Sequence, residues 1–273
     1  MTIKLVAFDM DGTFLNDQNT YNHQRFGTIL TKLRAKGIRV VSASGSQYQR
    51  LQDQFAEFQN QMDFVTQNGA VVYSQGQPLL IQAMPKEAVS KTLLAIQQQF
   101  AATDIAEHLV VGVKSAYVDQ QISQAAYDLT YHYYNHLKRV PSLVTVTPER
   151  LQDQITSIGI TFGDHVNFTD KVKTLQELLP NGLASQTAGF NTQLISEQSV
   201  NKARGLQQLQ EKYQIANDEI MTFGDDENDL SMLTITPHGY AMTNAGPKIK
   251  AAAQNLAVSN NDEGVLNVMS ELI

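Results

Sequence analysis

Apolar runs that end in polar, glycine-containing segments divide both ends of the chain into alternating strands and helices. Residues 3–8, 38–41 and 219–223 are short runs rich in β-forming residues, which is typical of strands buried in a parallel sheet. Residues 22–36 and 201–214 instead carry apolar side chains at helical spacing. We therefore predict an α/β fold, a Rossmann-like doubly wound parallel sheet.

The middle of the chain has a different pattern. It predicts helices near 86–100, 123–137 and 166–179, with strands near 108–118 and 143–162 between them. We expect an inserted α+β domain at 84–188, and a core formed by 1–83 and 189–273. In the core, residues 63–66, 67–73 and 75–78 are typical of short strands joined by tight turns, and the strand candidates at 240–242 and 256–258 extend the predicted sheet.

Acidic side chains follow two of the predicted buried strands. Asp9 and Asp11 come directly after residues 3–8, and Asp225 begins an acidic cluster after residues 219–223. An Asp-x-Asp-Gly string alone is also typical of a helix cap or an Asx turn. However, the carboxyl ends of parallel strands carry the chemistry in open α/β sheets, and gathered carboxylates repel each other unless a cation lies among them. The pattern favours a Mg²⁺ site.

Two further segments have features that a phosphate group requires. Ser44 and Gly45 lie where the strand at 38–41 gives way to a helix, and a hydroxyl with free backbone N–H groups suits an anion there. Lys202 lies near the start of the helix at 201–214, where its ammonium could neutralise phosphate charge.

Together and in this order, the four segments resemble the four motifs of the haloacid dehalogenase superfamily, and more narrowly its Cof-type phosphatases. The resemblance covers 1–80 and about 190–273. It implies that Asp9 is the nucleophile and Asp11 the general acid/base. It implies a Mg²⁺ site made by Asp9, Asp225 and the main-chain carbonyl of Asp11. Asp229 is expected to orient Lys202 or a metal-bound water. The implied phosphate contacts are the amide of Met10 together with Ser44, Gly45, Lys202 and Asn228.

The sequence departs from the family pattern at two positions. The second motif commonly has an arginine after its glycine, where this chain has Ser46; the residue after the third-motif lysine is often glycine, and here it is Ala203. Neither change removes a group assigned to the chemistry. The missing arginine could change how the start of the following helix is held.

The resemblance implies a Mg²⁺-dependent phosphatase that hydrolyses a small phosphorylated metabolite, a sugar phosphate or a phosphorylated cofactor, through an aspartyl-phosphate on Asp9. In this superfamily, phosphatases keep an acid at the position of Asp11, whereas related ion-pumping ATPases have a threonine there. One alternative is a phosphotransferase or phosphomutase on the same fold. A second is a catalytically slow protein that binds a phosphometabolite. The inserted domain is expected to be a C2-type cap that closes over the site and selects the substrate.

Composition agrees with a globular enzyme of two domains. The 273 residues exceed one typical domain, and the formal charge of −7 includes no basic cluster, so nucleic acid is not an expected partner. The chain has no cysteine, which excludes thiol catalysis. No apolar stretch is long enough for a membrane span or a signal peptide, and we expect a cytoplasmic protein. No pattern indicates an oligomeric state.

Overall fold

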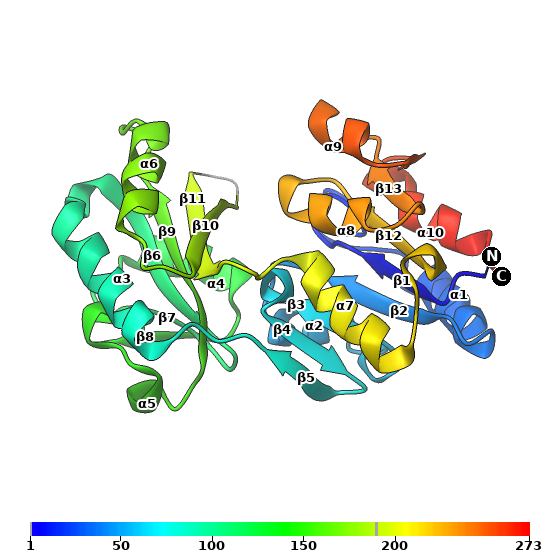
Figure 1. Cartoon of the computed structure of the whole chain (residues 1–273), viewed down its shortest axis with the longest axis horizontal. Helices are drawn as coiled ribbons and strands as arrows, with labels where there is room; N and C mark the ends of the chain where they lie inside the picture. The colour runs from blue at the N-terminus through cyan, green and yellow to red at the C-terminus, as the bar shows by residue number, and fades with distance from the viewer. Residues whose placement is uncertain (1, 189–190) are drawn as a thin grey trace. The chain divides into compact units, whose positions relative to one another are not determined.

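The chain forms two compact units, each with its own sheet (Figure 1). The computed structural model describes residues 2–188 and 191–273. The first unit comprises Met1–Gly45, Leu51–Leu80 and Asn201–Ile273, and the second comprises Ser46–Arg50 and Ile81–Val200.

An eight-stranded sheet forms the first unit. Its strand order is β14-β13-β12-β1-β2-β3-β4-β5, in which strands from the two ends of the chain lie side by side. The strands from β14 to β3 pair in parallel, and β4 runs antiparallel to β3. The strands are β1 (Leu5–Phe8), β2 (Arg39–Ala43), β3 (Asp63–Thr66), β4 (Val71–Ser74), β5 (Gln77–Ile81), β12 (Ile220–Gly224), β13 (Gly239–Met242) and β14 (Asn255–Ala257).

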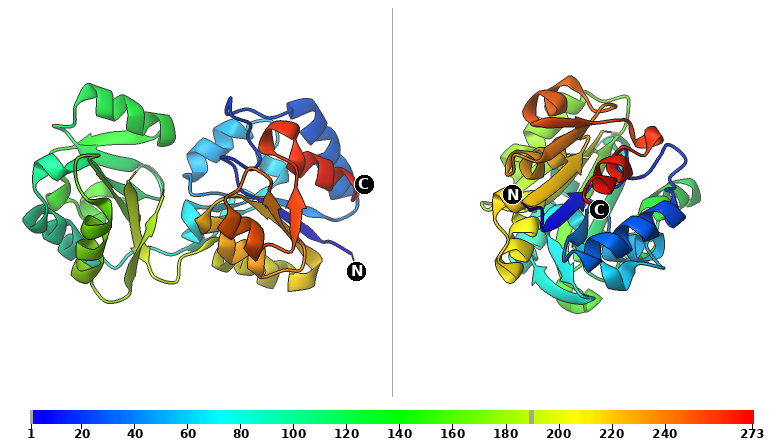
Figure 2. Two further views of the ribbon diagram at one scale, coloured as in Figure 1. Left: turned by 90° about the horizontal axis from the view of Figure 1, so that it is seen from above. Right: turned by 90° about the vertical axis from the view of Figure 1, so that its right-hand side faces the viewer.

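Helices cover both faces of this sheet, which explains why β1 is buried along its whole length (Figure 2). On one face, Leu5 and Ala7 pack with Leu206 and Leu209 of α7. On the other face, the ring of Phe8 lies among the rings of Phe14, Phe26 and Phe55. The helices of the unit are α1 (His23–Ala35), α2 (Tyr48–Gln54), which begins within the second unit, α7 (Lys202–Tyr213), α8 (Leu230–Thr234), α9 (Pro247–Ala252) and α10 (Gly264–Ser270).

A six-stranded sheet forms the second unit, in the order β10-β11-β9-β6-β7-β8. Its pairs are antiparallel except for β7 with β8. Helices α3 and α6 contribute to the larger apolar core, and Tyr127 and Tyr134 pack on a smaller cluster with Leu109 and Val111. The strands are β6 (Ile105–Gly112), β7 (Ala116–Asp119), β8 (Leu137–Val140), β9 (Ile155–Phe162), β10 (Leu183–Thr187) and β11 (Thr192–Glu197); the helices are α3 (Lys86–Gln99), α4 (Gln124–Tyr133), α5 (Pro148–Leu151) and α6 (Phe168–Leu178).

The structure differs from the sequence prediction in detail within the second unit. The helix expected at 123–137 ends at Tyr133, and the chain then forms β8. Residues 143–151 form two short helical turns before β9, rather than strand. The compact unit also extends past the predicted limit of 188, because the hairpin of β10 and β11 continues its sheet to Glu197.

The helices of the described residues are too short or too polar to cross a membrane.

Candidate active site

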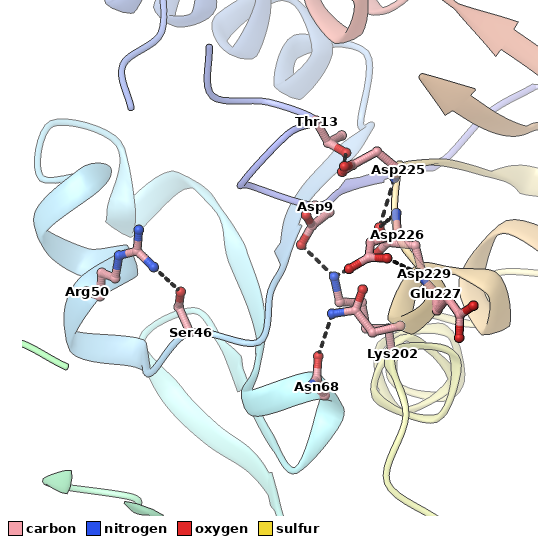
Figure 3. A network of polar contacts seen from close by, with 11 residues as sticks. Asp9, Thr13, Ser46, Arg50, Asn68, Lys202, Asp225, Asp226, Glu227 and Asp229 are labelled. Atoms are coloured by element: carbon pink, nitrogen blue, oxygen red, sulfur yellow. Dashed lines mark hydrogen bonds and ion pairs between the residues drawn. The ribbon is translucent and has the colours of Figure 1, made fainter. Parts of the chain in front are cut away.

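The register of three parallel strands brings the predicted catalytic segments to one edge of the core sheet. Phe8 at the end of β1 pairs with Ser42 of β2 on one side and with Phe223 of β12 on the other. Asp9, Ser44 and Asp225 follow these strands directly, so they lie at the same edge. Figure 3 shows Asp9 and Asp225 close together, with Lys202 reaching toward them from α7.

A tight turn directs the chain away from Asp9. The carbonyl oxygen of Met10 accepts hydrogen bonds from the backbone N–H groups of Thr13, Phe14 and Leu15, at 2.9 to 3.3 Å. Gly12 has a φ of +78°, and a Cβ at this position would lie 2.4 Å from Oδ2 of Asp225. Only glycine combines this backbone conformation with such a close approach. The turn therefore places Asp11 at the exposed rim of the site.

Lys202 is the buried cation of the site. Asn201 caps α7 by accepting from the backbone N–H of Arg204, and Lys202 is the first residue of the helix. Its Nζ donates to Oδ1 of Asp9 at 2.5 Å and to Oδ1 of Asp229 at 2.6 Å, and its side chain is fully buried. Burial opposes the charged form, but the two carboxylates outweigh it and raise the pKa of Lys202 above its ordinary value.

Asp229 holds several groups of the site in place. While Oδ1 accepts from Lys202, Oδ2 accepts from the backbone N–H groups of Asp225 and Asp226, at 2.9 and 3.1 Å. Asp225 is fixed from its other side, because Oδ1 accepts from the Thr13 hydroxyl at 2.5 Å. Asp229 is fully buried, and these contacts fit the predicted positioning role.

Burial perturbs the carboxylates at the centre. It raises the pKa of Asp9 well above its ordinary value; Lys202 opposes this increase, and Asp229 and Asp225 add to it. Burial also raises the pKa of Asp225 to about 6, although the hydrogen bond from Thr13 opposes the rise. The charged forms of both carboxylates are therefore disfavoured, and a bound cation would stabilise them.

The donor atoms fit a hard divalent cation. Carboxylate oxygens of Asp9, Asp225 and Asp229 lie within 4.8 Å of one another. Oxygen ligands of this kind suit Mg²⁺. Both oxygens of Asp229 already accept hydrogen bonds, which leaves Asp9 and Asp225 as the better ligands of the three.

The other predicted phosphate-binding residues lie on the segments that follow β1, β2 and β12. Ser44 is buried, and its backbone N–H donates to the carbonyl oxygen of Val65 at 2.8 Å. Met10 is buried next to Asp9. Asn228 lies in the short 3₁₀ turn Glu227–Asp229, and its Nδ2 donates to Oδ1 of Asn68 at 3.0 Å.

Sequence reasoning missed two residues of this site, Thr13 and Asn68. Thr13 directly follows Gly12, but no pattern in the sequence connects it with Asp225, which lies 212 positions further along. Asn68 belongs to an Asn-Gly pair after a strand, which is a turn signal, yet its contact with Asn228 spans 160 positions.

The structure also shows the contacts of Ser46 and Ala203, the two positions at which the sequence departs from the family pattern. The Ser46 hydroxyl accepts from Nη1 of Arg50 at 2.9 Å, so an arginine from the next helical turn contacts this position (Figure 3). Ala203 is buried, and its backbone N–H donates to the Ser231 hydroxyl at 3.3 Å.

Comparison with known proteins identifies the family. The family model of haloacid dehalogenase-like hydrolases matches residues 6–269. The chain belongs to this family. It is 35% identical over 273 residues to 5-amino-6-(5-phospho-D-ribitylamino)uracil phosphatase YbjI of Escherichia coli K12, covering 100% of this chain and 97% of the relative. A Bacillus subtilis phosphatase of the same description, YitU, is 26% identical over 98% of this chain and 96% of its own length.

A solved structure supports the same assignment. The crystal structure of SMU.1108c from Streptococcus mutans UA159 superimposes with a TM-score of 0.89 at 28% identity, covering 99% of this chain and 98% of that one. The predicted fold class, the family resemblance and the prediction of a hydrolytic enzyme are thereby confirmed.

Proposed function

We propose that this hydrolase is a Mg²⁺-dependent phosphatase that releases inorganic phosphate from a small phosphorylated metabolite. The observation that carries the proposal is the buried contact of Lys202 with Asp9 and Asp229, at a sheet edge that also holds Asp225. A carboxylate held against a fully buried ammonium, beside a second carboxylate with a raised pKa, suits phosphoryl transfer to Asp9.

Asp9 is the proposed nucleophile. Lys202 contacts its Oδ1, which leaves Oδ2 to attack phosphorus in line with the leaving oxygen. The bond from phosphorus to the leaving oxygen breaks, and an aspartyl-phosphate forms. An ammonium has three N–H donors, and two of those on Lys202 are directed at Asp9 and Asp229. The third can donate to a phosphoryl oxygen and stabilise the charge that develops there.

Asp11 is the proposed general acid and base. It lies at the exposed rim, two residues after Asp9, where a leaving group and water have access. It would give a proton to the leaving oxygen and then take a proton from the water that attacks the aspartyl-phosphate. Inorganic phosphate leaves, and both carboxyl groups return to their starting states.

Asp9, Asp225 and the main-chain carbonyl of Asp11 would hold Mg²⁺. When bound, the ion supplies positive charge that neutralises phosphoryl oxygens and the carboxylates around them. The hydrogen bond from Thr13 keeps Asp225 oriented for this role, and the backbone contacts of Asp229 keep the segment that carries Asp225 in place.

The first substrate to test is 5-amino-6-(5-phospho-D-ribitylamino)uracil, because the Escherichia coli relative named for it aligns with the whole chain. We further propose that the second unit is a cap that determines which phosphate ester is accepted. A lid of this kind excludes water from the reacting groups while the core sheet holds them rigidly.

Phosphate release across a panel of phosphorylated sugars and cofactors, with that compound included, tests the proposal. We expect release that requires Mg²⁺, stops with EDTA and is absent in Asp9→Asn. Release without an added acceptor distinguishes hydrolysis from the phosphotransferase or phosphomutase alternative. Transfer of the phosphoryl group to a second sugar hydroxyl, with no inorganic phosphate released, would replace the phosphatase by a transferase. No release, with a phosphorylated ligand still bound, would replace it by a binding protein.

A further inference from the structure

Two consecutive non-glycine residues next to the site have left-handed backbone conformations. Gln67 has a φ of 51° and Asn68 a φ of 56°, and Gly69 follows with a φ of 98°. This turn comes directly after β3. Such conformations cost free energy for residues with a Cβ, and they persist where the surrounding structure enforces them. We therefore expect contacts of the surrounding residues to hold this turn in its left-handed conformation.

The turn is held from two sides. The backbone N–H of Asn68 donates to the carbonyl oxygen of Ser44 at 3.0 Å, which fixes it against the segment after β2. On the other side, a Cβ at Gly69 would lie 2.1 Å from the carbonyl oxygen of Asn201, the residue that caps α7. The turn thus packs between the segment that carries Ser44 and the helix start that carries Lys202.

This backbone directs the Asn68 side chain into the site. Its Oδ1 accepts from Nδ2 of Asn228 at 3.0 Å, and it lies 3.3 Å from the position that a Cβ on Gly45 would occupy. Figure 3 shows the Asn68 side chain pointing toward the cluster around Lys202. The carboxamide is therefore hydrogen-bonded to one predicted phosphate-binding segment and lies close to another, and these two segments follow strands on opposite sides of β1.

The hydrogen bond restricts the carboxamide of Asn228. A carboxamide NH₂ group has two N–H donors, and one of those on Asn228 is directed at Asn68. This hydrogen bond limits rotation of the amide, which still has a second N–H that can donate to a phosphoryl oxygen. Asn228 is partly exposed on a short turn, so its carboxamide would have more rotational freedom without this hydrogen bond.

We propose that Asn68 is a positioning residue for phosphate recognition: held in its left-handed turn, it orients the Asn228 carboxamide toward the phosphoryl group. The inference rests on the proposed phosphatase function. Asn68 lies outside the four motifs, and its left-handed turn places its side chain against Asn228.

The decisive variant is Asn68→Gly, because glycine adopts the left-handed conformation and only the carboxamide is lost. We expect about a tenfold loss of kcat/KM, a similar loss of affinity for inorganic phosphate measured by calorimetry, and an unchanged melting temperature. Asn19→Gly is the matched control, since Asn19 also has a φ of 56° but is exposed in another loop; it should behave as wild type.

A double-mutant cycle with Asn228→Ala tests whether Asn68 acts through Asn228. If Asn68 acts through Asn228, Asn68→Gly should cause little further loss of phosphate affinity when Asn228 is already alanine. Equal losses in both backgrounds would overturn the positioning role. Wild-type values for Asn68→Gly in an active enzyme would overturn the inference alone. A wild-type protein that neither releases nor binds phosphate would overturn the proposed function and the inference with it.

Discussion

Replacing Lys202 by methionine tests the electrostatic balance of the site. Lys202 is fully buried and contacts two carboxylates, at 2.5 and 2.6 Å. Methionine preserves much of the side-chain volume but leaves Asp9, Asp225 and Asp229 with no cation among them in the absence of metal. Removing one partner of a buried ion pair costs about 3 to 5 kcal/mol. We expect about 3 kcal/mol here, because a carboxylate in the variant can take up a proton.

The assay is thermal unfolding with EDTA present. For a chain of this size, a loss of about 3 kcal/mol lowers the melting temperature by about 5 °C. Lys212→Met is the control, since Lys212 is an exposed lysine on the same helix. The double variant Lys202→Met/Asp229→Asn removes one of the uncompensated carboxylates and should recover part of the lost stability.

Two results would contradict this prediction. A melting temperature of Lys202→Met within about 2 °C of wild type would show that the buried ammonium does not compensate the carboxylates. A double variant that is less stable than Lys202→Met would show that Asp229 stabilises the fold through its backbone contacts rather than destabilising it through its charge.

Three further predictions concern other parts of the molecule. Asp225→Asn should raise the Mg²⁺ concentration needed for half-maximal phosphate release by about 10- to 100-fold, because it removes the charge of a proposed ligand. Asn260→Ala should lower the free energy of unfolding by about 1 to 3 kcal/mol, measured with urea, because buried Asn260 donates to the carbonyl oxygen of Leu15 at 2.9 Å. Burial lowers the pKa of His108 to about 4, an effect that Asp119 opposes, so the unfolded chain takes up this proton first as the pH falls. The stability linked to His108 is complete above about pH 6.5 and should decrease by up to about 3 kcal/mol as the pH falls to about 4, measured by urea unfolding.

Each of these predictions has its own control. Asp226→Asn removes a nearby carboxylate that the proposal does not assign to the metal, and it should leave the Mg²⁺ requirement unchanged; an equal shift would contradict the ligand assignment. Exposed Asn261 is the comparison for Asn260, and an equal loss in Asn261→Ala would remove the argument from burial. For His108, a pH dependence that persists in His108→Gln would assign the effect to other groups.

The sequence was most informative where local pattern and topology agree. The apolar run before Asp9 and the run before Asp225 both predicted buried strands, and in the structure β1 and β12 are buried and paired in parallel. Because such strands end at the same edge, the proximity of the two carboxylates followed from the fold class. Lys202 was predicted to lie near a helix start because the apolar residues after it have helical spacing.

Contacts between distant segments could not be predicted in this way. The Asn68–Gly69 pair indicated a turn, but its left-handed backbone and its contact with Asn228 depend on packing between β3 and α7. In the second unit, β8 and β10 are short and largely polar, so neither shows the apolar period on which strand prediction relies. Their pairing with neighbouring strands, rather than local pattern, makes them strands.

The most direct test of the account is to look for the phosphoryl group on Asp9. Acid quenching during turnover of the identified substrate, followed by peptide mass spectrometry, should detect phosphorylated Asp9 in wild type. We predict none in Asp9→Asn, which lacks the nucleophilic carboxylate. A phosphoryl group on another residue, or turnover that survives in Asp9→Asn, would contradict the assignment of Asp9 as the nucleophile.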